Sequence, residues 1–264
     1  MSHNATSPPA GPQAHNLLTG KVVVITAAAG TGIGASVARR CIEEGATVVI
    51  SDIHERRLAK AVDTLEATTG TRPGSVPCNV TQQDQVDALL QHALDQHGRI
   101  DVLINNAGLG GTSDLVDMTD EAWDKVIDVT LTATMRCMRS ALRIMRDQPG
   151  GGVIVNNASV LGWRAQRGQS HYAAAKAGVM ALTRCAAVEA ADFGVRINAV
   201  APSLAMHKFL HKVTSPELLA QLEAKEAYGR AATTDEVANV MVFLASDLST
   251  YMTGEVVSVS SRRA

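Results

Sequence analysis

Short runs of β-branched and aliphatic residues recur along the chain, separated by longer stretches whose apolar positions recur at helical spacing. Unbroken Val/Ile runs are typical of strands in a parallel sheet that is covered on both faces. The predicted strands are Val22–Thr26, Thr47–Ser51, Val76–Val80, Val102–Asn105, Val153–Asn156, Val195–Val200 and Glu255–Val259. A helix follows the first strand, and the later predicted helices are His54–Glu66, Gln83–His97, Thr119–Arg146, His171–Ala191 and Thr234–Ser246. This alternation predicts one doubly wound α/β domain.

The domain organisation follows from the length and from two irregular segments. A chain of 264 residues has the length of one large α/β domain, and no shift in composition marks a second one. Residues 1–18 are rich in Pro, Ser and Asn, so we expect a mobile tail before a domain of residues 19–264. Residues 202–232 form a long excursion at the carboxyl end of a strand. This position predicts a substrate loop or lid, and the alternative is a surface helical hairpin.

Charge and composition narrow the classes of function. Lys and Arg total 24 against 26 Asp and Glu, and the net charge of −2 gives no electrostatic footprint for non-specific nucleic-acid binding. The apolar runs are far shorter than a membrane span, so no membrane partner is expected. The four cysteines, Cys41, Cys78, Cys137 and Cys185, form no CxxC pair and have apolar or small neighbours. We therefore expect buried free thiols, a cytoplasmic protein and no metal site.

A glycine-rich turn follows the first predicted strand, in the sequence Thr26-Ala-Ala-Ala-Gly30-Thr-Gly32-Ile-Gly34. Glycines at a strand-to-helix turn let the backbone approach a diphosphate, and the N-terminus of the helix offers unpaired N–H groups. Asp52 lies 20 residues beyond Gly32, where an acid accepts hydrogen bonds from an adenosine ribose. Its carboxylate would repel a 2′-phosphate, which favours NAD over NADP. Arg56 and Arg57 weaken the preference for NAD, because a nearby cation can hold a 2′-phosphate. The alternative is that both are ordinary surface residues of the next helix.

A serine, a tyrosine and a lysine indicate acid–base chemistry. Tyr172 and Lys176 are four residues apart, so on a helix they share one face. A neighbouring ammonium lowers the pKa of a tyrosine, which can then exchange a proton with an alcohol or ketone. Ser159 follows the fifth predicted strand, and its hydroxyl can polarise a substrate carbonyl. The alternative is a packing tyrosine beside a surface lysine, and His171 is expected to be a bystander about 100° around the helix.

These residues together resemble the short-chain dehydrogenase/reductase family. Ser159, Tyr172 and Lys176 match the catalytic residues of that family in type and spacing. The sequence Asn105-Asn106-Ala107-Gly108 is similar to its NNAG motif, and Asp52 matches the acid of members that prefer NAD. The resemblance therefore implies an oxidoreductase that uses a nicotinamide cofactor.

The resemblance covers nearly all of residues 18–259 and implies a Rossmann-type fold with a seven-stranded parallel sheet flanked by helices. It also implies a homotetramer, whose main interface is normally built by two long helices, here 119–146 and 171–191. The cofactor-binding positions that it implies are Thr26, Gly30, Gly32, Ile33, Gly34, Asp52, Asn79, Val80, Asn106, Ala107, Gly108, Tyr172, Lys176, Pro202 and Ser203.

The sequence also departs from the family pattern. The first glycine of the turn is replaced by Ala27, and the turn is one residue longer. The asparagine of the usual catalytic tetrad falls at Thr130, which puts the proton-relay water of the family in doubt. Further departures, at positions that often contact the cofactor or follow the last strand, are Asn79, Ser203, His207 and Ser260-Ser261-Arg262.

Several stretches resemble one subgroup of the family, the actinobacterial reductases of steroid C/D-ring catabolism. They include VVISDIHERRL, NNASVLGWRAQ and SHYAAAKAGVMALTR. This resemblance implies a ring hydroxyl or ketone of a methyl-indanone propionyl-CoA as substrate, so a CoA thioester is the expected small-molecule partner. An acyl-CoA needs an apolar slot and cations for its phosphates. The candidate substrate contacts are Trp163, Arg164, His207 and Lys208.

Two alternatives stay open beside an NAD-dependent dehydrogenase/reductase. A 3-oxoacyl-acyl-carrier-protein reductase of fatty-acid metabolism has similar motifs, but it usually uses NADPH, which Asp52 disfavours. A non-catalytic NAD(H)-binding sensor would tolerate Thr130 and the altered turn, but it has no need of an acid–base set such as Ser159, Tyr172 and Lys176.

Overall fold

The structure, a computed structural model, describes residues 7–206, 210 and 215–262. Its centre is a seven-stranded sheet in the order β3-β2-β1-β4-β5-β6-β9, in which every neighbouring pair is parallel. The strands are β1 (Val22–Ile25), β2 (Thr47–Asp52), β3 (Gly74–Pro77), β4 (Val102–Asn105), β5 (Gly152–Asn157), β6 (Val195–Pro202) and β9 (Val256–Val259). This arrangement confirms the single Rossmann-type domain that the sequence predicts. The strand order reverses between β1 and β4, where folds of this kind bind ligands.

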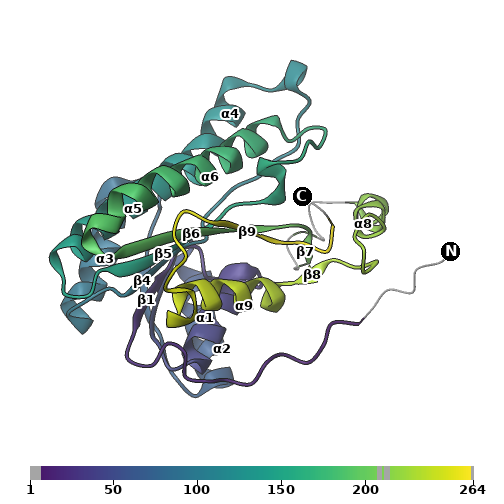
Figure 1. The fold of residues 1–264 in the computed structure, drawn as a ribbon. Coiled ribbons are helices and arrows are strands. Elements are labelled where there is room, and N and C mark those ends of the chain that lie inside the picture. Colours follow the sequence, from purple (N-terminus) through teal and green to yellow (C-terminus); the bar gives the residue numbers. More distant parts are fainter. Residues whose placement is uncertain (1–6, 207–209, 211–214, 263–264) are drawn as a thin grey trace.

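Helices cover both faces of the sheet (Figure 1). One face carries α1 (Ile33–Glu43), α2 (Glu55–Thr69) and α9 (Thr234–Ala245). The other carries α3 (Gln83–His97), α4 (Asp120–Ile127), α5 (Ala133–Asp147) and α6 (Ser170–Ala190). Successive residues of a strand point to opposite faces of the sheet. Val23 and Ile25 pack with α1 and α9, whereas Val24 packs with α3 and α5. Burial on both faces explains why the strands read as unbroken apolar runs.

Two predicted elements differ from the structure. The strand predicted at Val76–Val80 ends at Pro77, because the chain turns at Asn79, whose Oδ1 accepts hydrogen bonds from the amide and the hydroxyl of Thr81 at 3.1 and 2.9 Å. The helix predicted at Thr119–Arg146 is interrupted between α4 and α5 by a π-helical turn at Asp128–Thr132. A π-helical turn contains one residue more than a turn of α-helix, and it often lies at a functional site.

The excursion of residues 202–232 lies at the carboxyl end of the sheet (Figure 1). Its described part contains β7 (Ala205–Met206), which pairs in parallel with β8 (Ala232–Thr233), and α8 (Pro216–Glu223). The side chain of Ser215 caps α8 by accepting a hydrogen bond from the amide of Leu218. The segment is therefore more than a simple hairpin, and its action as a lid stays a prediction.

The N-terminal segment passes along α1 and α9. The carboxylate of Glu44 accepts hydrogen bonds from the amides of His15 and Leu17 at 2.9 and 3.1 Å, and Leu18 is fully buried in the core. The last residues of the predicted tail of residues 1–18 therefore pack against the domain.

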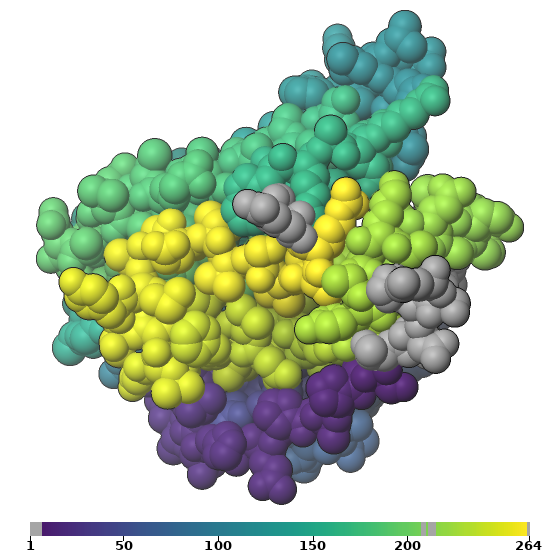
Figure 2. Space-filling model, turned by 45° about the vertical axis from the view of Figure 1, so that its right-hand side comes forward, coloured from purple at the N-terminus to yellow at the C-terminus, as the bar shows by residue number. Residues whose placement is uncertain are grey.

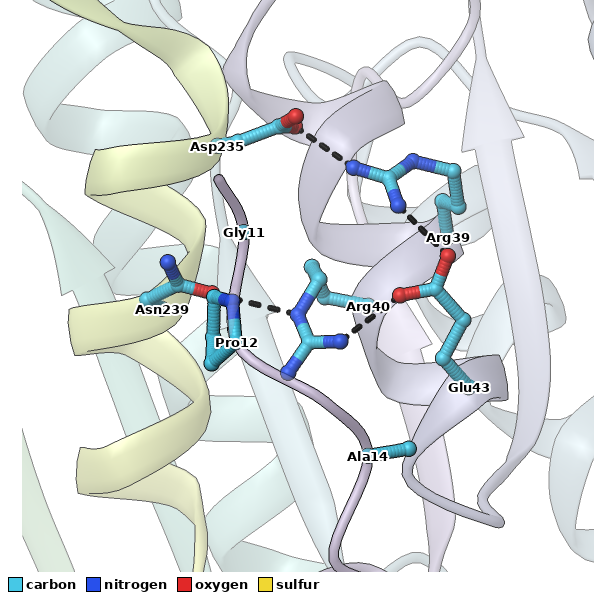
Figure 3. A pocket seen from close by; sticks show the side chains of 8 residues that line it. All are labelled: Gly11, Pro12, Ala14, Arg39, Arg40, Glu43, Asp235 and Asn239. Carbon is cyan, nitrogen blue, oxygen red and sulfur yellow. Dashed lines mark hydrogen bonds and ion pairs between the residues drawn. The ribbon is translucent and has the colours of Figure 1, made fainter. Parts of the chain in front are cut away.

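A cavity of about 450 Å³ lies between this segment and the two helices (Figure 3). Arg39 pairs there with Asp235 at 2.8 Å, and Arg40 pairs with Glu43 at 2.7 Å and donates to Asn239 at 3.1 Å. The charged groups around this cavity are therefore engaged with one another.

The four cysteines are free thiols. Cys41, Cys78 and Cys137 are buried as predicted, but Cys185 is exposed, which corrects the expectation for that residue. Its small neighbours in sequence do not decide which face of α6 it occupies, and it shares the outer face with the exposed Val188. Within residues 7–206, 210 and 215–262, no His, Cys, Asp or Glu side chains cluster in a way that suits a metal ion. No helix in this part of the chain is long and apolar enough to cross a membrane.

Candidate active site

The turn after β1 opens the N-terminus of α1 towards the crevice. Gly32 is the N-cap of α1 and provides no side-chain hydrogen bond, so the amides of the first turn are not capped by a side chain at this position. Gly30 has a φ of 134°, which favours glycine. A Cβ on Gly34 would lie 2.4 Å from Nδ2 of Asn106 and 2.7 Å from the carbonyl oxygen of Ala27. The turn therefore depends on glycine at both positions and offers backbone N–H groups and a helix dipole to an anion.

The NNAG segment after β4 is fastened to the end of β1. The hydroxyl oxygen of Thr26 accepts hydrogen bonds from the amides of Asn106 and Ala107 at 3.0 and 3.1 Å. The side chain of Asn106 donates to the carbonyl oxygens of Thr26 and Ala27 at 3.2 and 2.9 Å. Because Thr26 is buried, its contribution to a cofactor site is indirect: it holds the NNAG segment in place.

Asp52 ends β2 at the same edge of the sheet. It is buried, and this burial raises the pKa of its carboxyl, while the charge of Arg57 opposes the rise. The guanidinium of Arg57 is 3.7 Å from Oδ1 of Asp52 and is half-exposed. Asn79 and Val80 follow β3, and the side-chain oxygen of Asn79 is engaged by Thr81 as described above. The edge therefore presents a carboxylate where an adenosine ribose would lie.

The predicted catalytic residues come together at the ends of β5 and α6. Ser159 follows β5, and its hydroxyl lies close enough to the phenol of Tyr172 to lower the pKa of that phenol. The hydroxyl oxygen of Ser159 also accepts a hydrogen bond from the amide of Leu161 at 3.2 Å. Lys176 lies one turn of α6 beyond Tyr172, with its ammonium 5.5 Å from the centre of the phenol ring. The joint geometry excludes the alternative of a packing tyrosine beside a surface lysine, because Lys176 is only 3% exposed.

Burial governs the protonation of these groups. It raises the pKa of Tyr172, and the hydrogen bond with Ser159 opposes the rise. It also lowers the pKa of Lys176 to about 8. The expectation that the ammonium lowers the pKa of Tyr172 is therefore wrong for this structure: desolvation of the phenol dominates. Tyr172 is held as a neutral phenol at pH 7, the form that donates a proton.

Two neighbours of Lys176 determine where its ammonium points. It donates to the carbonyl oxygen of Asn157 at 2.5 Å, and a Cβ on Gly108 would lie 3.3 Å from its nitrogen. Asn157 also donates from its side chain to Oδ1 of Asn106 at 3.1 Å, so it links the lysine to the NNAG segment. Asn157 is not among the site residues predicted from the sequence. The signal available was a second consecutive asparagine at the end of a buried strand, where a polar residue needs partners.

Thr130 occupies the π-helical turn and is fully buried. Its hydroxyl donates to the carbonyl oxygen of Leu109 at 3.1 Å and accepts from the amide of Leu109 at 3.0 Å. Thr130 therefore anchors the residue that follows the NNAG segment, and its proton is committed to that contact.

The loop after Ser159 forms one side of the site. Trp163 is 44% exposed, and Arg164 donates hydrogen bonds to residues at the C-terminus. Pro202 ends β6, and the amide of Ser203 donates to the carbonyl oxygen of Val259. The predicted substrate contacts His207 and Lys208 lie outside the described residues. The expected bystander His171 is buried, and its Nε2 faces Gly111.

Comparisons with known proteins agree with this geometry. A family model described as enoyl-(acyl carrier protein) reductase matches residues 27–261. The chain is 64% identical over 246 residues to the (5R,7aS)-5-hydroxy-7a-methyl-1-oxo-2,3,5,6,7,7a-hexahydro-1H-indene-carboxyl-CoA reductase of Mycobacterium tuberculosis, which covers 93% of this chain and 94% of that protein. It is 39% identical to the 3-oxoacyl-(acyl-carrier-protein) reductase FabG of Thermotoga maritima, over 92% of this chain and 97% of that protein. The crystal structure of a short chain dehydrogenase from Mycobacterium smegmatis is 58% identical with a TM-score of 0.88, over 99% of this chain and all of that one.

Proposed function

The chain belongs to the short-chain dehydrogenase/reductase family, and from that premise we propose that it interconverts a secondary alcohol and a ketone on a bicyclic acyl-CoA. The observation that carries the reaction is the buried Lys176, whose side-chain nitrogen lies 5.5 Å from the ring centre of Tyr172, with the hydroxyl of Ser159 near the phenol. A buried serine and a partly buried tyrosine next to a cation provide a hydrogen-bond donor and a proton donor for one carbonyl oxygen.

The residues present fit a nicotinamide dinucleotide. The glycine turn, where a Cβ on Gly34 would collide with Asn106, and the uncapped start of α1 suit its diphosphate. When bound, the nicotinamide supplies or accepts a hydride. We infer a preference for NAD, supported by the buried carboxylate of Asp52 at the end of β2.

The chain's own residues supply the proton chemistry. In reduction, Tyr172 gives its phenolic proton to the carbonyl oxygen of the substrate; in oxidation it takes that proton back. Ser159 donates a hydrogen bond to the same oxygen. Its hydroxyl oxygen accepts from the amide of Leu161, and its hydroxyl hydrogen is left for the substrate. Lys176, oriented by Asn157, holds its side-chain nitrogen 5.5 Å from the centre of the phenol ring, beside the group that exchanges the proton. Because burial raises the pKa of Tyr172, the phenol that reduction needs is present at neutral pH, and the rate of oxidation should rise with pH.

The proposed substrate is a hydroxy-methyl-hexahydroindanone attached to CoA through a carboxylic side chain, an intermediate of steroid ring degradation. Its support is the 64% identity to a reductase whose name specifies such a compound. Trp163 is half-exposed on the loop after Ser159 and suits a flat ring system.

The test is NADH production from NAD⁺ with three substrates in parallel: a bicyclic hydroxy-acid CoA thioester, its free acid and a short 3-hydroxyacyl-CoA. Turnover restricted to the bicyclic thioester is the expected result. Tyr172→Phe should still bind NADH but lose activity by about 100-fold or more. Substantial activity in that variant would overturn the role of Tyr172.

A 3-oxoacyl-acyl-carrier-protein reductase is the second candidate, favoured by the 39% identity to such an enzyme. Preference for the short acyl chain together with NADPH would establish it. Binding of NADH without turnover on any substrate would instead favour a non-catalytic sensor.

We also propose a cytoplasmic homotetramer. Support for the assembly is the exposed apolar Val188 on α6 and Trp123 on α4, and support for the location is the set of free thiols. Light scattering coupled to size-exclusion chromatography tests the assembly, and a monomer would refute it.

A further inference from the structure

Three segments that are distant in sequence meet beside the site. The guanidinium of Arg164, in the loop after Ser159, donates to the carbonyl oxygen of Arg262 at 2.5 Å and to the hydroxyl of Ser260 at 3.4 Å. The hydroxyl of Ser260 in turn donates to the same carbonyl oxygen at 2.8 Å. Arg164 therefore ties the loop to the last described residues of the chain.

The same C-terminal residues hold the end of the excursion that contains α8. The hydroxyl of Ser261 donates to the carboxylate of Glu226 at 2.9 Å, and Glu226 is only 9% exposed. The charge of Glu226 also acts favourably on the guanidinium of Arg164. We call these five residues, Arg164, Glu226, Ser260, Ser261 and Arg262, the C-terminal clasp.

The clasp lies at the carboxyl end of the sheet, the edge where ligands of this fold bind. Val259 at the end of β9 is in register with Pro202 at the end of β6, and its carbonyl oxygen accepts from the amide of Ser203 at 3.0 Å. In Figure 2 the C-terminal strand, in yellow, lies between the green layer that contains α6 and the yellow-green segment of α8. The clasp thus joins the two walls that flank the end of the site.

Arg164 was predicted as a substrate contact, but the hydrogen bonds of its guanidinium go to the protein itself. Resting on the function proposed above, we propose that Arg164 is a positioning residue that sets substrate size. Through the clasp it holds the loop of Trp163 at a fixed place relative to α8, and so fits the site to a bicyclic ring. A single-ring ketone is too small to contact both the loop of Trp163 and the segment of α8. Its turnover should therefore not depend on the clasp.

Arg164→Gln tests this proposal, with Arg167→Gln as the matched control. Arg167 lies in the same loop, is largely exposed and pairs with Asp114 instead of the clasp. In Arg164→Gln, we expect kcat/KM for the bicyclic ketone to fall about tenfold through KM, with kcat/KM for cyclohexanone and KM for NADH unchanged. Ser261→Ala should move the ratio of the two substrates in the same direction. An unchanged ratio in Arg164→Gln, or an equal change in the control, would overturn the proposal.

A second measurement does not depend on turnover. The protein has two tryptophans, so a Trp123→Phe background leaves Trp163 as the only one. In that background, Arg164→Gln should make the fluorescence of Trp163 more accessible to acrylamide, whereas Arg167→Gln should not. Equal quenching in all three proteins would refute the positioning of the loop. If the wild-type protein turns over no ketone, the proposed function fails, but the quenching result still decides whether the clasp holds the loop.

Discussion

Lys176 is the buried cation of the site. Its replacement by Met should abolish turnover but raise the free energy of unfolding, so the two effects of the lysine can be measured separately. Burial lowers its pKa from 10.5 to about 8. Where the pKa of a group is lower in the folded than in the unfolded chain, the unfolded chain binds more protons between the two values, and stability rises with pH. Lys176 therefore destabilises the folded state at pH 7, and the cost shrinks as the pH rises from 8 towards 10.5.

The expected magnitude follows from that shift. One pKa unit corresponds to about 1.4 kcal/mol, so a fall from 10.5 to about 8 costs about 3 kcal/mol at pH 7. Met has a similar length and no charge, but the variant loses the hydrogen bond from the charged ammonium to the carbonyl oxygen of Asn157, worth about 1.5 kcal/mol. Lys176→Met should therefore raise the free energy of unfolding by about 2 kcal/mol at pH 7 and abolish turnover. At pH 9 the gain should drop to about 1 kcal/mol.

Urea unfolding followed by circular dichroism at pH 7 and pH 9 measures these values. Lys225→Met is the control, because Lys225 is exposed and its loss should change stability by less than about 0.5 kcal/mol. The buried thiols of Cys41 and Cys137, with pKa values raised to about 12, make every variant less stable as the pH rises above 9, so the difference between proteins is the relevant quantity. A variant that is less stable than wild type at pH 7, or whose gain grows towards pH 9, would refute the reasoning.

Three further substitutions probe the cofactor side of the site. Ala27 has a φ of 51°, so Ala27→Gly should raise the free energy of unfolding by up to about 1 kcal/mol in the same urea assay, and a decrease would contradict the strain. Gly34→Ala places a methyl group 2.4 Å from Nδ2 of Asn106 and should lower the free energy of unfolding by about 1–3 kcal/mol; wild-type stability would show that the turn adapts. Asp52→Asn should raise KM for NAD⁺ about tenfold and narrow the preference over NADP⁺, whereas an unchanged ratio of kcat/KM values would remove Asp52 from cofactor selection.

Much of the fold could be predicted from the sequence, because burial on both faces gives each strand a continuous apolar run. An apolar run predicts the end of a strand wrongly where a side chain hydrogen-bonds to the nearby backbone. At Asn79 such a bond turns the chain, and β3 ends earlier than predicted. The π-helical turn at Asp128–Thr132 was not predicted, because its five residues have no sequence pattern that distinguishes it from a continuing α-helix. It is stabilised by the contact of Thr130 with Leu109, which joins residues 21 positions apart.

The site could be predicted in outline because helical spacing alone brings Tyr172 and Lys176 to one face. The direction of the pKa shift of Tyr172 could not, since it depends on how deeply the fold buries the phenol. The partner of Arg164 lies 98 residues away in sequence, and no local pattern connects a loop arginine to a backbone carbonyl at the C-terminus. Contacts of this kind are set by topology, here by the position of β9 beside β6.

The position of β9 has a consequence for biosynthesis. β9 is an edge strand of the sheet and is synthesised after the other six strands, and a domain generally folds as a unit. The strands β1, β2 and β4, which line the dinucleotide crevice, precede β9 by more than half of the chain. The sheet therefore lacks its last strand, and the substrate side lacks the residues Ser260–Arg262, until all the other strands have been synthesised. A stop codon shortly before β9 would leave the crevice strands intact in sequence and remove the element that closes the substrate side.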